Sequence, residues 1–378
     1  MKTTYRLDGL RETMAERGVE VSLILAPDNQ FYLSGFKAVI YSRPILLLVS
    51  KEDTSIIVPG LERDHAEGEK AADEILVYYE HPEMAEHGTS HLEHLDRLLD
   101  SYASGTTVGI EFDSCPVSLA DYLHEKDFRV SDIGTTLTEM RYVKDKAEFE
   151  RVEQAGHLVN LAVSKSLAAC RPGATELDVD AAGTAALFDE AAKNYPEATL
   201  EAMAFSPSGP DRSAWPHVFS NTRRLVEGDV LIHSRQVSLN GYRAELERTV
   251  ILGEPTERQR EAFEVAREAQ QAAIDAIELG VTAASVDHAA REIIQNAGYG
   301  DYAIHRTGHG LGISAHEEPH LRFDNDLILE EGMVFTVEPG FYVPGLGGFR
   351  HSDTLVVEKD GSRLVTEYPR DLESLTLC

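Results

Sequence analysis

Three histidines in a glycine-rich segment are the first sign of a reactive site. His305, His309 and His316 fall within twelve residues, and a glycine stands on each side of His309. Glycine lets the backbone approach a ligand closely, which a lone core histidine does not need. Glu338 follows an apolar run and precedes a Pro-Gly turn, where a carboxylate is costly unless it binds a metal, a cation or a hydrogen-bond donor. With His217, at the end of a loop held by two prolines, these residues predict metal binding or proton transfer.

Alternating apolar and amphipathic segments predict an α/β unit in the first third of the chain. Apolar runs at 21–27, 44–50 and 54–60 have strand length, and the charged turn at 51–53 predicts a hairpin between the last two. The Pro-Asp-Asn segment at 27–29 is expected to close the first strand as a turn. These runs predict a small sheet covered by helices.

Beyond residue 140 the pattern becomes two helices followed by short strands, and it occurs twice. Helical spacing with start and stop residues recurs at four places, 145–169, 175–194, 256–277 and 284–297. The repeated order predicts a pseudo-duplicated α+β domain around one curved sheet. The site is then expected on that sheet, between its two halves.

Acidic residues dominate the charge of the 378-residue chain. Lys and Arg number 35 against 65 Asp and Glu, which gives a net charge of −30. A surface of that sign repels phosphate backbones and anionic lipids, so neither nucleic acid nor a membrane is an expected partner. No lysine occurs between Lys193 and Lys359. This composition suits a cytoplasm at molar salt, where charges are screened, and predicts a halophilic, haloarchaeal source; an acidic mesophilic protein is the alternative.

The three cysteines, Cys115, Cys170 and Cys378, share no metal-binding spacing. They favour a reducing compartment and give no disulfide framework. The first ten residues lack the apolar core of a signal peptide, and no apolar run reaches the length of about 18 residues that a membrane span needs. We therefore expect a cytoplasmic location.

Motifs along nearly the whole chain carry a resemblance to a known family. They are NQFYLSGF at 29–36, RPILLLV at 43–49, and then SGPDRSAWPH, HRTGHGLG, AHEEP, GMVFTVEPG and GGFRHSDT. In this order the chain resembles the M24 peptidases of the pita-bread fold, which include aminopeptidase P, prolidase and creatinase. The resemblance implies a creatinase/prolidase-type N-terminal domain at 1–138, a pita-bread catalytic domain at 139–378, and a homodimer.

The metal ligands that the resemblance implies are changed in this chain. The family's peptidases hold two bridged divalent ions with two Asp, one His and two Glu. The corresponding places are read here as His233, Glu245, His309, Glu338 and Ser352. Two cations need several anionic oxygens against their mutual repulsion, and only two carboxylates remain. We expect at most one ion, Mn, Co or Zn, on the first four of these residues, or no metal at all.

Catalytic roles follow from the chemistry of the side chains. His217 and His316 are expected to transfer protons and to face the oxyanion, because the ordinary pKa of histidine suits transfer in both directions near neutral pH. Glu338 is expected either to bind the metal or, without one, to act as the base that orients the attacking water.

Substrate contacts are expected from His305, Glu247, Arg350 and His351. The resemblance to creatinase places substrate-binding carboxylates at Glu247 and at the position that His351 occupies here, so one of the two carboxylates that would hold creatine is absent. Arg350 is expected to meet a substrate carboxylate in a bidentate pair. The structural alternatives are an ion pair of Glu247 with the neighbouring Arg248 and one of Arg350 with Asp353.

Three functions remain open at this point. The first is a C–N hydrolase of the aminopeptidase P or prolidase type, with a remodelled, at most mononuclear metal site and a short peptide as substrate. The second is a metal-independent hydrolase, like creatinase or the ectoine hydrolases, that acts on a small nitrogen compound. The third is a non-catalytic pita-bread binding module. The converging histidines disfavour the third, because a binding module does not need so many titratable groups.

Overall fold

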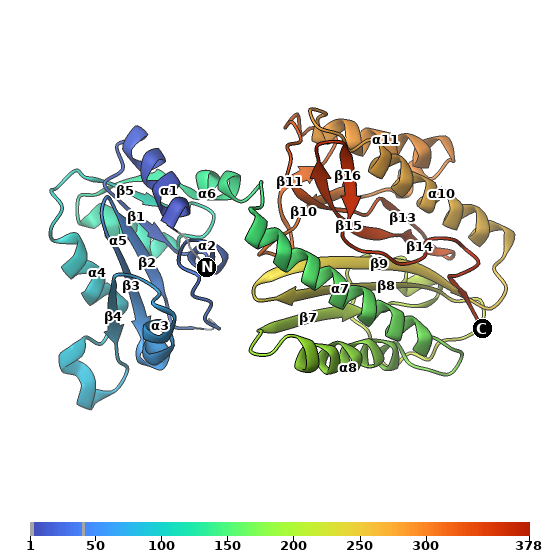
Figure 1. Cartoon of the computed structure of the whole chain (residues 1–378), viewed down its shortest axis with the longest axis horizontal. Coiled ribbons are helices and arrows are strands. Elements are labelled where there is room, and N and C mark those ends of the chain that lie inside the picture. The colour runs from blue at the N-terminus through green and yellow to red at the C-terminus, as the bar shows by residue number, and fades with distance from the viewer. Residues whose placement is uncertain (1–3, 40–41) are drawn as a thin grey trace. The chain divides into compact units, whose positions relative to one another are not determined.

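Two units make up the computed structural model, Met1–Met140 and Arg141–Cys378, and the structure describes residues 4–39 and 42–378 (Figure 1). Within these described ranges no helix is long and apolar enough to cross a membrane.

The N-terminal unit is built on a six-stranded mixed sheet in the order β4-β3-β2-β1-β5-β6. The strands are β1 (Val21–Ile24), β2 (Leu46–Ser50), β3 (Thr54–Pro59), β4 (Glu74–Tyr78), β5 (Thr107–Ile110) and β6 (Arg129–Asp132). The helices are α1 (Thr4–Glu16), α2 (Pro27–Ser34), α3 (Arg63–Glu69), α4 (His91–Leu99), α5 (Val117–Glu125) and α6 (Gly134–Met140). The predicted hairpin is confirmed, because β2 pairs antiparallel with β3.

The first strand ends earlier than the sequence predicts. Strand β1 stops at Ile24, and Pro27 begins helix α2 where a turn was expected. Proline is tolerated at the first helical position because its missing N–H would have no partner there. The buried Glu111 carboxylate accepts hydrogen bonds from the backbone N–H groups of Leu25 (2.5 Å) and Ala26 (2.9 Å), which fixes this junction.

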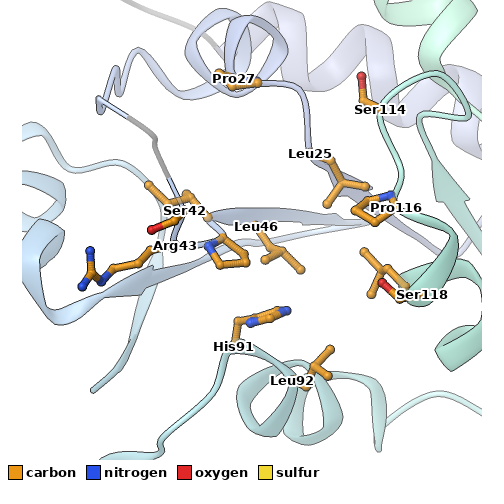
Figure 2. Close-up of a pocket in the computed structure, with 13 residues that line it drawn as sticks. Leu25, Pro27, Ser42, Arg43, Leu46, His91, Leu92, Ser114, Pro116 and Ser118 are labelled. Atoms are coloured by element: carbon orange, nitrogen blue, oxygen red, sulfur yellow. The ribbon is translucent and has the colours of Figure 1, made fainter. Parts of the chain in front are cut away.

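The N-terminal unit contains a cavity of about 470 Å³ with mostly apolar walls. Figure 2 shows Leu25, Leu46 and Leu92 pointing into it. Arg43 extends away from the cavity and forms an ion pair of 2.7 Å with Glu80. None of the residues predicted to do chemistry belongs to this unit.

One curled sheet of nine strands forms the centre of the C-terminal unit. Its order is β11-β10-β12-β15-β9-β8-β7, with β16 beside β15 and β17 beside β9. The strands are β7 (Leu200–Phe205), β8 (Val230–Leu239), β9 (Tyr242–Leu252), β10 (Gly308–Gly310), β11 (Glu317–Leu321), β12 (Val334–Val337), β15 (Ser352–Glu358), β16 (Gly361–Leu364) and β17 (Thr376–Leu377). A separate hairpin joins β13 (Gly340–Val343) to β14 (Gly347–Arg350).

Two helix pairs cover this sheet, one for each half. Helices α7 (Lys146–Ala169) and α8 (Glu176–Asn194) lie along β7, β8 and β9, and α10 (Glu257–Asp275) and α11 (Ala283–Asn296) lie over the other half (Figure 1). The short helix α9 (Gly209–Arg212) precedes the loop that carries His217. The repeated order of two helices and then strands confirms the predicted pita-bread architecture.

Capping side chains explain why the four long helices begin where the sequence predicts. Asp145, Thr175 and Thr256 each form a capping box at the start of α7, α8 and α10, and Thr282 caps α11. Each such cap stabilises its helix by about 1 kcal/mol. The apolar faces of all four helices then bury residues such as Phe263 in one core with the sheet.

Strands β8 and β9 form the hairpin that positions most of the site. The turn residues at 240–241 have positive φ angles of 49° and 86°, which suit a two-residue hairpin turn. The register pairs Ser234 with Glu247 and Gln236 with Glu245. Because directly paired residues share a face, these four side chains lie on one face of the sheet.

Candidate active site

A cavity of about 360 Å³ opens on that face of the sheet. Its walls come from β7, β8, β9, the loop after α9, the residue before β11, the residue after β12 and the last residue of β14. The lining residues are Met203, Phe205, His217, Val218, Phe219, Ser234, Gln236, Glu245, Glu247, His316, Glu338 and Arg350. The structure therefore gathers His217, His316, Glu338, Glu247 and Arg350 around one space, as the sequence predicts for a site on the sheet.

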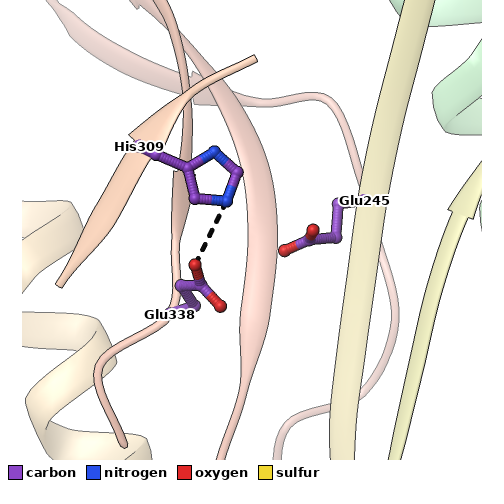
Figure 3. A group of neighbouring side chains, drawn as sticks. All are labelled: Glu245, His309 and Glu338. Carbon is purple, nitrogen blue, oxygen red and sulfur yellow. Dashed lines mark ion pairs between the residues drawn. The ribbon is translucent and has the colours of Figure 1, made fainter. Parts of the chain in front are cut away.

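Glu245, His309 and Glu338 form the closest group of possible metal ligands (Figure 3). One ligand atom of each lies within 4.8 Å of the others. His309 Nε2 is 3.2 Å from Glu338 Oε1, and the Glu245 carboxylate points toward this pair from β9. All three side chains are buried.

The charges of these three side chains influence one another. Burial and the charge of Glu338 raise the pKa of Glu245. Although burial opposes it, the hydrogen bond and charge of His309, with the charge of Arg350, hold the pKa of Glu338 below its ordinary value. His309 has a raised pKa, because Glu338 and Glu245 outweigh the effect of burial. Two buried carboxylates this close repel each other unless a positive charge lies between them.

The donor set fits one divalent ion. The Nδ1–H of His309 donates to the carbonyl oxygen of Gly310 (2.8 Å), so Nε2 faces the two carboxylates, as in a metal-binding histidine. Two Glu and one His suit Mn, Co or Zn. Ser352 brings a hydroxyl to this group, which donates to Glu245 Oε1 (2.8 Å).

His233 does not join this group, which corrects the expected set of four ligands. It lies on the opposite face of β8, fully buried, with Nδ1 2.8 Å from Ser206 Oγ and 3.8 Å from Asp180 Oδ1. Side chains alternate along a strand, so the neighbouring Ser234 faces the cavity instead. The position that the motif comparison assigned to His233 is therefore one residue out of register.

His351 is also outside the cavity, which corrects its expected substrate contact. It is fully buried, and its ring packs edge-on against Phe263 with centroids 4.8 Å apart. Burial, with the charge of Arg248 nearby, lowers the pKa of His351 well below its ordinary value. Its neighbours Arg350 and Ser352 point to the site side, as alternation requires.

His305 is not a lining residue of the cavity, and it is connected to the lining residue Arg350 through Tyr342. Its Nδ1–H donates to the carbonyl oxygen of Arg306 (2.7 Å), so Nε2 accepts from the hydroxyl of Tyr342 (2.9 Å). Burial lowers the pKa of His305 to about 4. His305 is therefore a neutral partner of Tyr342, and the predicted direct substrate contact has no counterpart among the lining residues.

Arg350 pairs with Glu247, which excludes both structural alternatives. Its Nη2 donates to Glu247 Oε1 (2.7 Å), and its Nε is 2.5 Å from Glu247 Oε2. Asp353 instead accepts from Arg248 (2.9 Å), within the core. The guanidinium also donates from Nη1 to the Tyr342 hydroxyl (2.9 Å). Burial raises the pKa of Glu247, and the charge of the paired Arg350 opposes this shift.

His316 stacks on His309 with ring centroids 4.0 Å apart. Burial and the neighbouring His309 lower its pKa to about 4, so the ring is neutral at pH 7. Arg306 Nη2 donates to His316 Nδ1 (3.3 Å), and because arginine only donates, the ring proton is on Nε2. His217 lines the cavity from an exposed position on its loop.

Glu317, the residue that follows His316, is buried. It accepts hydrogen bonds from the backbone N–H groups of Ile313 (2.7 Å) and Ser314 (2.8 Å), and it pairs with Lys144 and Arg141. These contacts fix the loop that carries His316.

The sequence did not predict four residues that shape the site. Ser234 and Gln236 line the cavity from β8, Phe219 lines it from the loop, and Tyr342 connects Arg350 with His305. Alternation along β8 puts Ser234 and Gln236 on the same face, which could have indicated that they act together. Both faces of that strand segment are polar, however, so the sequence does not tell which face lines the site.

Comparison with known proteins agrees with this fold. Residues 150–359 match the model of metallopeptidase family M24, and residues 6–143 match the creatinase/prolidase N-terminal domain. The putative dipeptidase YkvY of Bacillus subtilis is 33% identical over 372 residues, which cover 97% of this chain and 99% of that protein. The Xaa-Pro dipeptidase of Pyrococcus furiosus is 30% identical, with the same coverage. The crystal structure of the prolidase from Pyrococcus horikoshii OT3 superposes with a TM-score of 0.83 at 28% identity, over 97% of this chain and 99% of that one. The chain therefore belongs to metallopeptidase family M24, a family of hydrolases.

Proposed function

We propose that this protein hydrolyses the amide bond before proline in short peptides, with at most one divalent ion held by Glu245, His309 and Glu338. The convergence of these three buried donors beside a cavity carries the proposal. The names of the relatives support the substrate class, since they include Xaa-Pro dipeptidases aligned over nearly the whole chain. A bound ion would polarise the carbonyl of the scissile bond.

The side chains around the cavity have separate parts in this reaction. With an ion present, Glu245 and Glu338 would hold it beside the cavity; without a metal, Glu338 acts as the base that orients the water attacking the carbonyl carbon. The Nε2–H of His316 donates a hydrogen bond to the oxygen that becomes negative, which a neutral histidine can do without giving up its proton. His217 delivers a proton to the leaving nitrogen as the C–N bond breaks.

Metal content and activity, measured on the same preparation, test the proposal. The protein is expressed with Mn, Co or Zn and assayed by elemental analysis and by hydrolysis of the dipeptide Ala-Pro and of longer peptides that begin with Ala-Pro, before and after chelation. We expect one ion or fewer per chain and hydrolysis that the chelator abolishes. Two tightly held ions per chain would contradict the mononuclear site. If metal-free protein hydrolyses the peptides at the same rate, the metal-independent mechanism is correct instead. If the protein hydrolyses none of these peptides, a non-catalytic binding module is the hypothesis that stays.

A matched pair of variants separates the site from general effects of charge. Glu338→Gln removes a ligand and is expected to lower kcat by about 100-fold or more. Glu254→Gln makes the same chemical change at a side chain that is 83% exposed and should leave kcat unchanged.

We also expect a homodimer, as the family resemblance implies, and light scattering at high salt measures this directly.

A further inference from the structure

The guanidinium of Arg350 lines the cavity and is already paired within the protein. Two of its nitrogens contact Glu247 at 2.7 and 2.5 Å, Nη1 donates to Tyr342 at 2.9 Å, and Nε is also 3.8 Å from Glu338 Oε2. Arg350 is 4% exposed and Glu247 2%. A substrate carboxylate that formed a bidentate pair with this arginine would compete with Glu247, and displacing Glu247 would leave a buried carboxylate without its partner.

The cavity as a whole is unfavourable for an anion. Among the described residues that line it, Arg350 is the one Arg or Lys, against the three carboxylates of Glu245, Glu247 and Glu338. A divalent ion on Glu245 and Glu338 would balance those two charges, and Glu247 would still neutralise Arg350. The free carboxylate of a substrate therefore meets no Arg or Lys among these lining residues whose charge is not already balanced by Glu247.

Gln236 offers an unpaired hydrogen-bond acceptor in the wall of the cavity. Its Nε2 donates to Glu245 Oε2 (2.6 Å) and to the carbonyl oxygen of Ala315 (3.1 Å). This orientation leaves Gln236 Oε1, which is buried, without a hydrogen-bond partner among residues 4–39 and 42–378. A ligand that supplies an N–H satisfies this oxygen, whereas a carboxylate adds a further acceptor.

We infer that Glu247 makes this cavity select peptides whose prolyl carboxyl is bound in an amide, namely longer peptides or peptide amides, over dipeptides that end in a free carboxylate. The inference rests on the proposed function and specifies its substrate class. Glu247 acts as a specificity-determining residue, because its carboxylate pairs with Arg350, the arginine that the free carboxylate of a dipeptide would need. The amide form brings an N–H and no charge, which suits Gln236 and the acidic wall.

Two substrates that differ only at that end test the inference. The unmodified protein, loaded with Mn, is assayed on Ala-Pro and on Ala-Pro-amide. We expect kcat/KM for the amide to exceed that for the free acid by about tenfold or more, with the difference mainly in KM. Equal values, or a preference for the free acid, would overturn the inference while leaving the proposed hydrolysis intact.

Variants identify the residue that sets this preference. Glu247→Gln keeps the shape of the side chain and removes its charge, so Arg350 is freed for a carboxylate. The ratio of the two kcat/KM values is expected to shift toward the free acid by about tenfold. Glu254→Gln is the control and should keep the ratio of the parent. An unchanged ratio in a folded Glu247→Gln variant would remove Glu247 as the cause of the preference.

Failure of the proposed function gives a different result from failure of this inference. If neither compound is hydrolysed, the proposed function is wrong, and calorimetric binding of the same two compounds decides the inference. Tighter binding of Ala-Pro-amide supports it. Tighter binding of Ala-Pro, or no binding of either compound, overturns it.

Discussion

Ser352 donates a hydrogen bond of 2.8 Å from its hydroxyl to Oε1 of Glu245. The two residues come from neighbouring strands, β15 and β9, and both are buried. A hydroxyl at this place holds the carboxylate as a neutral partner, whereas a second carboxylate would repel it unless a cation lay between them. The contact thus directs Glu245 toward His309 and Glu338, which supports the proposed site for at most one metal ion.

The charge of the chain predicts that its stability depends on salt. A net charge of −30 gives strong self-repulsion at low ionic strength, and the Debye length falls to about 3 Å at 1 M salt. We predict that the thermal unfolding midpoint rises steeply between about 0.1 M and about 3 M KCl. Circular dichroism follows the transition. A midpoint that stays constant over this range would contradict the halophilic origin.

His351 predicts a specific dependence of stability on pH. Neither of its ring nitrogens has a hydrogen-bond partner in the described part of the chain, and burial holds its pKa well below the ordinary value. The folded state therefore keeps this ring neutral, while the unfolded chain takes up a proton below about pH 6.5. Stability is lost as the pH falls through that value, since the unfolded state binds more protons.

The substitution His351→Leu should remove this proton uptake. We predict that the free energy of unfolding at pH 7 rises by about 1 kcal/mol, because an unpaired buried polar ring is replaced by an apolar side chain. The fall in stability between about pH 6.5 and 5 should also become shallower. Urea titrations at several pH values measure both. His157→Leu, at a side chain that is 63% exposed, is the control and should keep the slope of the parent.

The contacts of Glu317 predict that Lys144 supports both stability and catalysis. Their side chains are 5% and 2% exposed and 3.3 Å apart, and Arg141 also pairs with Glu317. Lys144→Met leaves part of a buried charge without its partner, so we predict a loss of about 3 kcal/mol in the free energy of unfolding. Since Glu317 fixes the loop that carries His316, kcat should fall as well. Adding Glu317→Gln to this variant should recover stability and leave kcat low; a double variant with parental kcat would contradict the role of the loop.

Much of the architecture follows from signals that are local in the sequence. The four long helices begin at side chains that cap them, such as Asp145 and Thr256, and their apolar faces have one period. The residues around His309 and Glu338 indicated a site, because a carboxylate within an apolar segment is costly to bury without a ligand or a partner. The sequence did not predict that Pro27 starts a helix, since proline suits both a turn and a first helical turn.

The details of the site were harder to predict because of the period of two in strands. In β8 the segment 233–236 is polar on both faces, since His233 and Arg235 bind a buried network beneath the sheet while Ser234 and Gln236 face the cavity. Residue types alone do not tell these faces apart, and a shift of one residue moves every side chain to the other face. The same ambiguity placed His351 in the site.

The corrected register gives a sharp prediction about metal binding. Ser234→Asp together with Ser352→Glu places two more carboxylates on the face of Glu245, His309 and Glu338. These charges compensate the repulsion between two cations, so we predict uptake of about two Mn or Co ions per chain in place of one or fewer. Metal should also raise the thermal midpoint of this variant more than that of the parent, because it binds only the folded state. Calorimetric titration measures the stoichiometry.

The matched control is His233→Asp together with Ser352→Glu. It places the new aspartate at position 233 in place of position 234 and keeps the second substitution. A carboxylate at position 233 lies against Ser206 and Asp180 on the other face of β8, and so adds a buried negative charge that does not reach the metal ligands. We predict that this variant takes up no more metal than the parent and is less stable by about 2 kcal/mol or more. Equal uptake by the two double variants would contradict the assignment of faces. No gain in either would mean that the second ion was lost for reasons beyond its ligands, such as the groups that orient them.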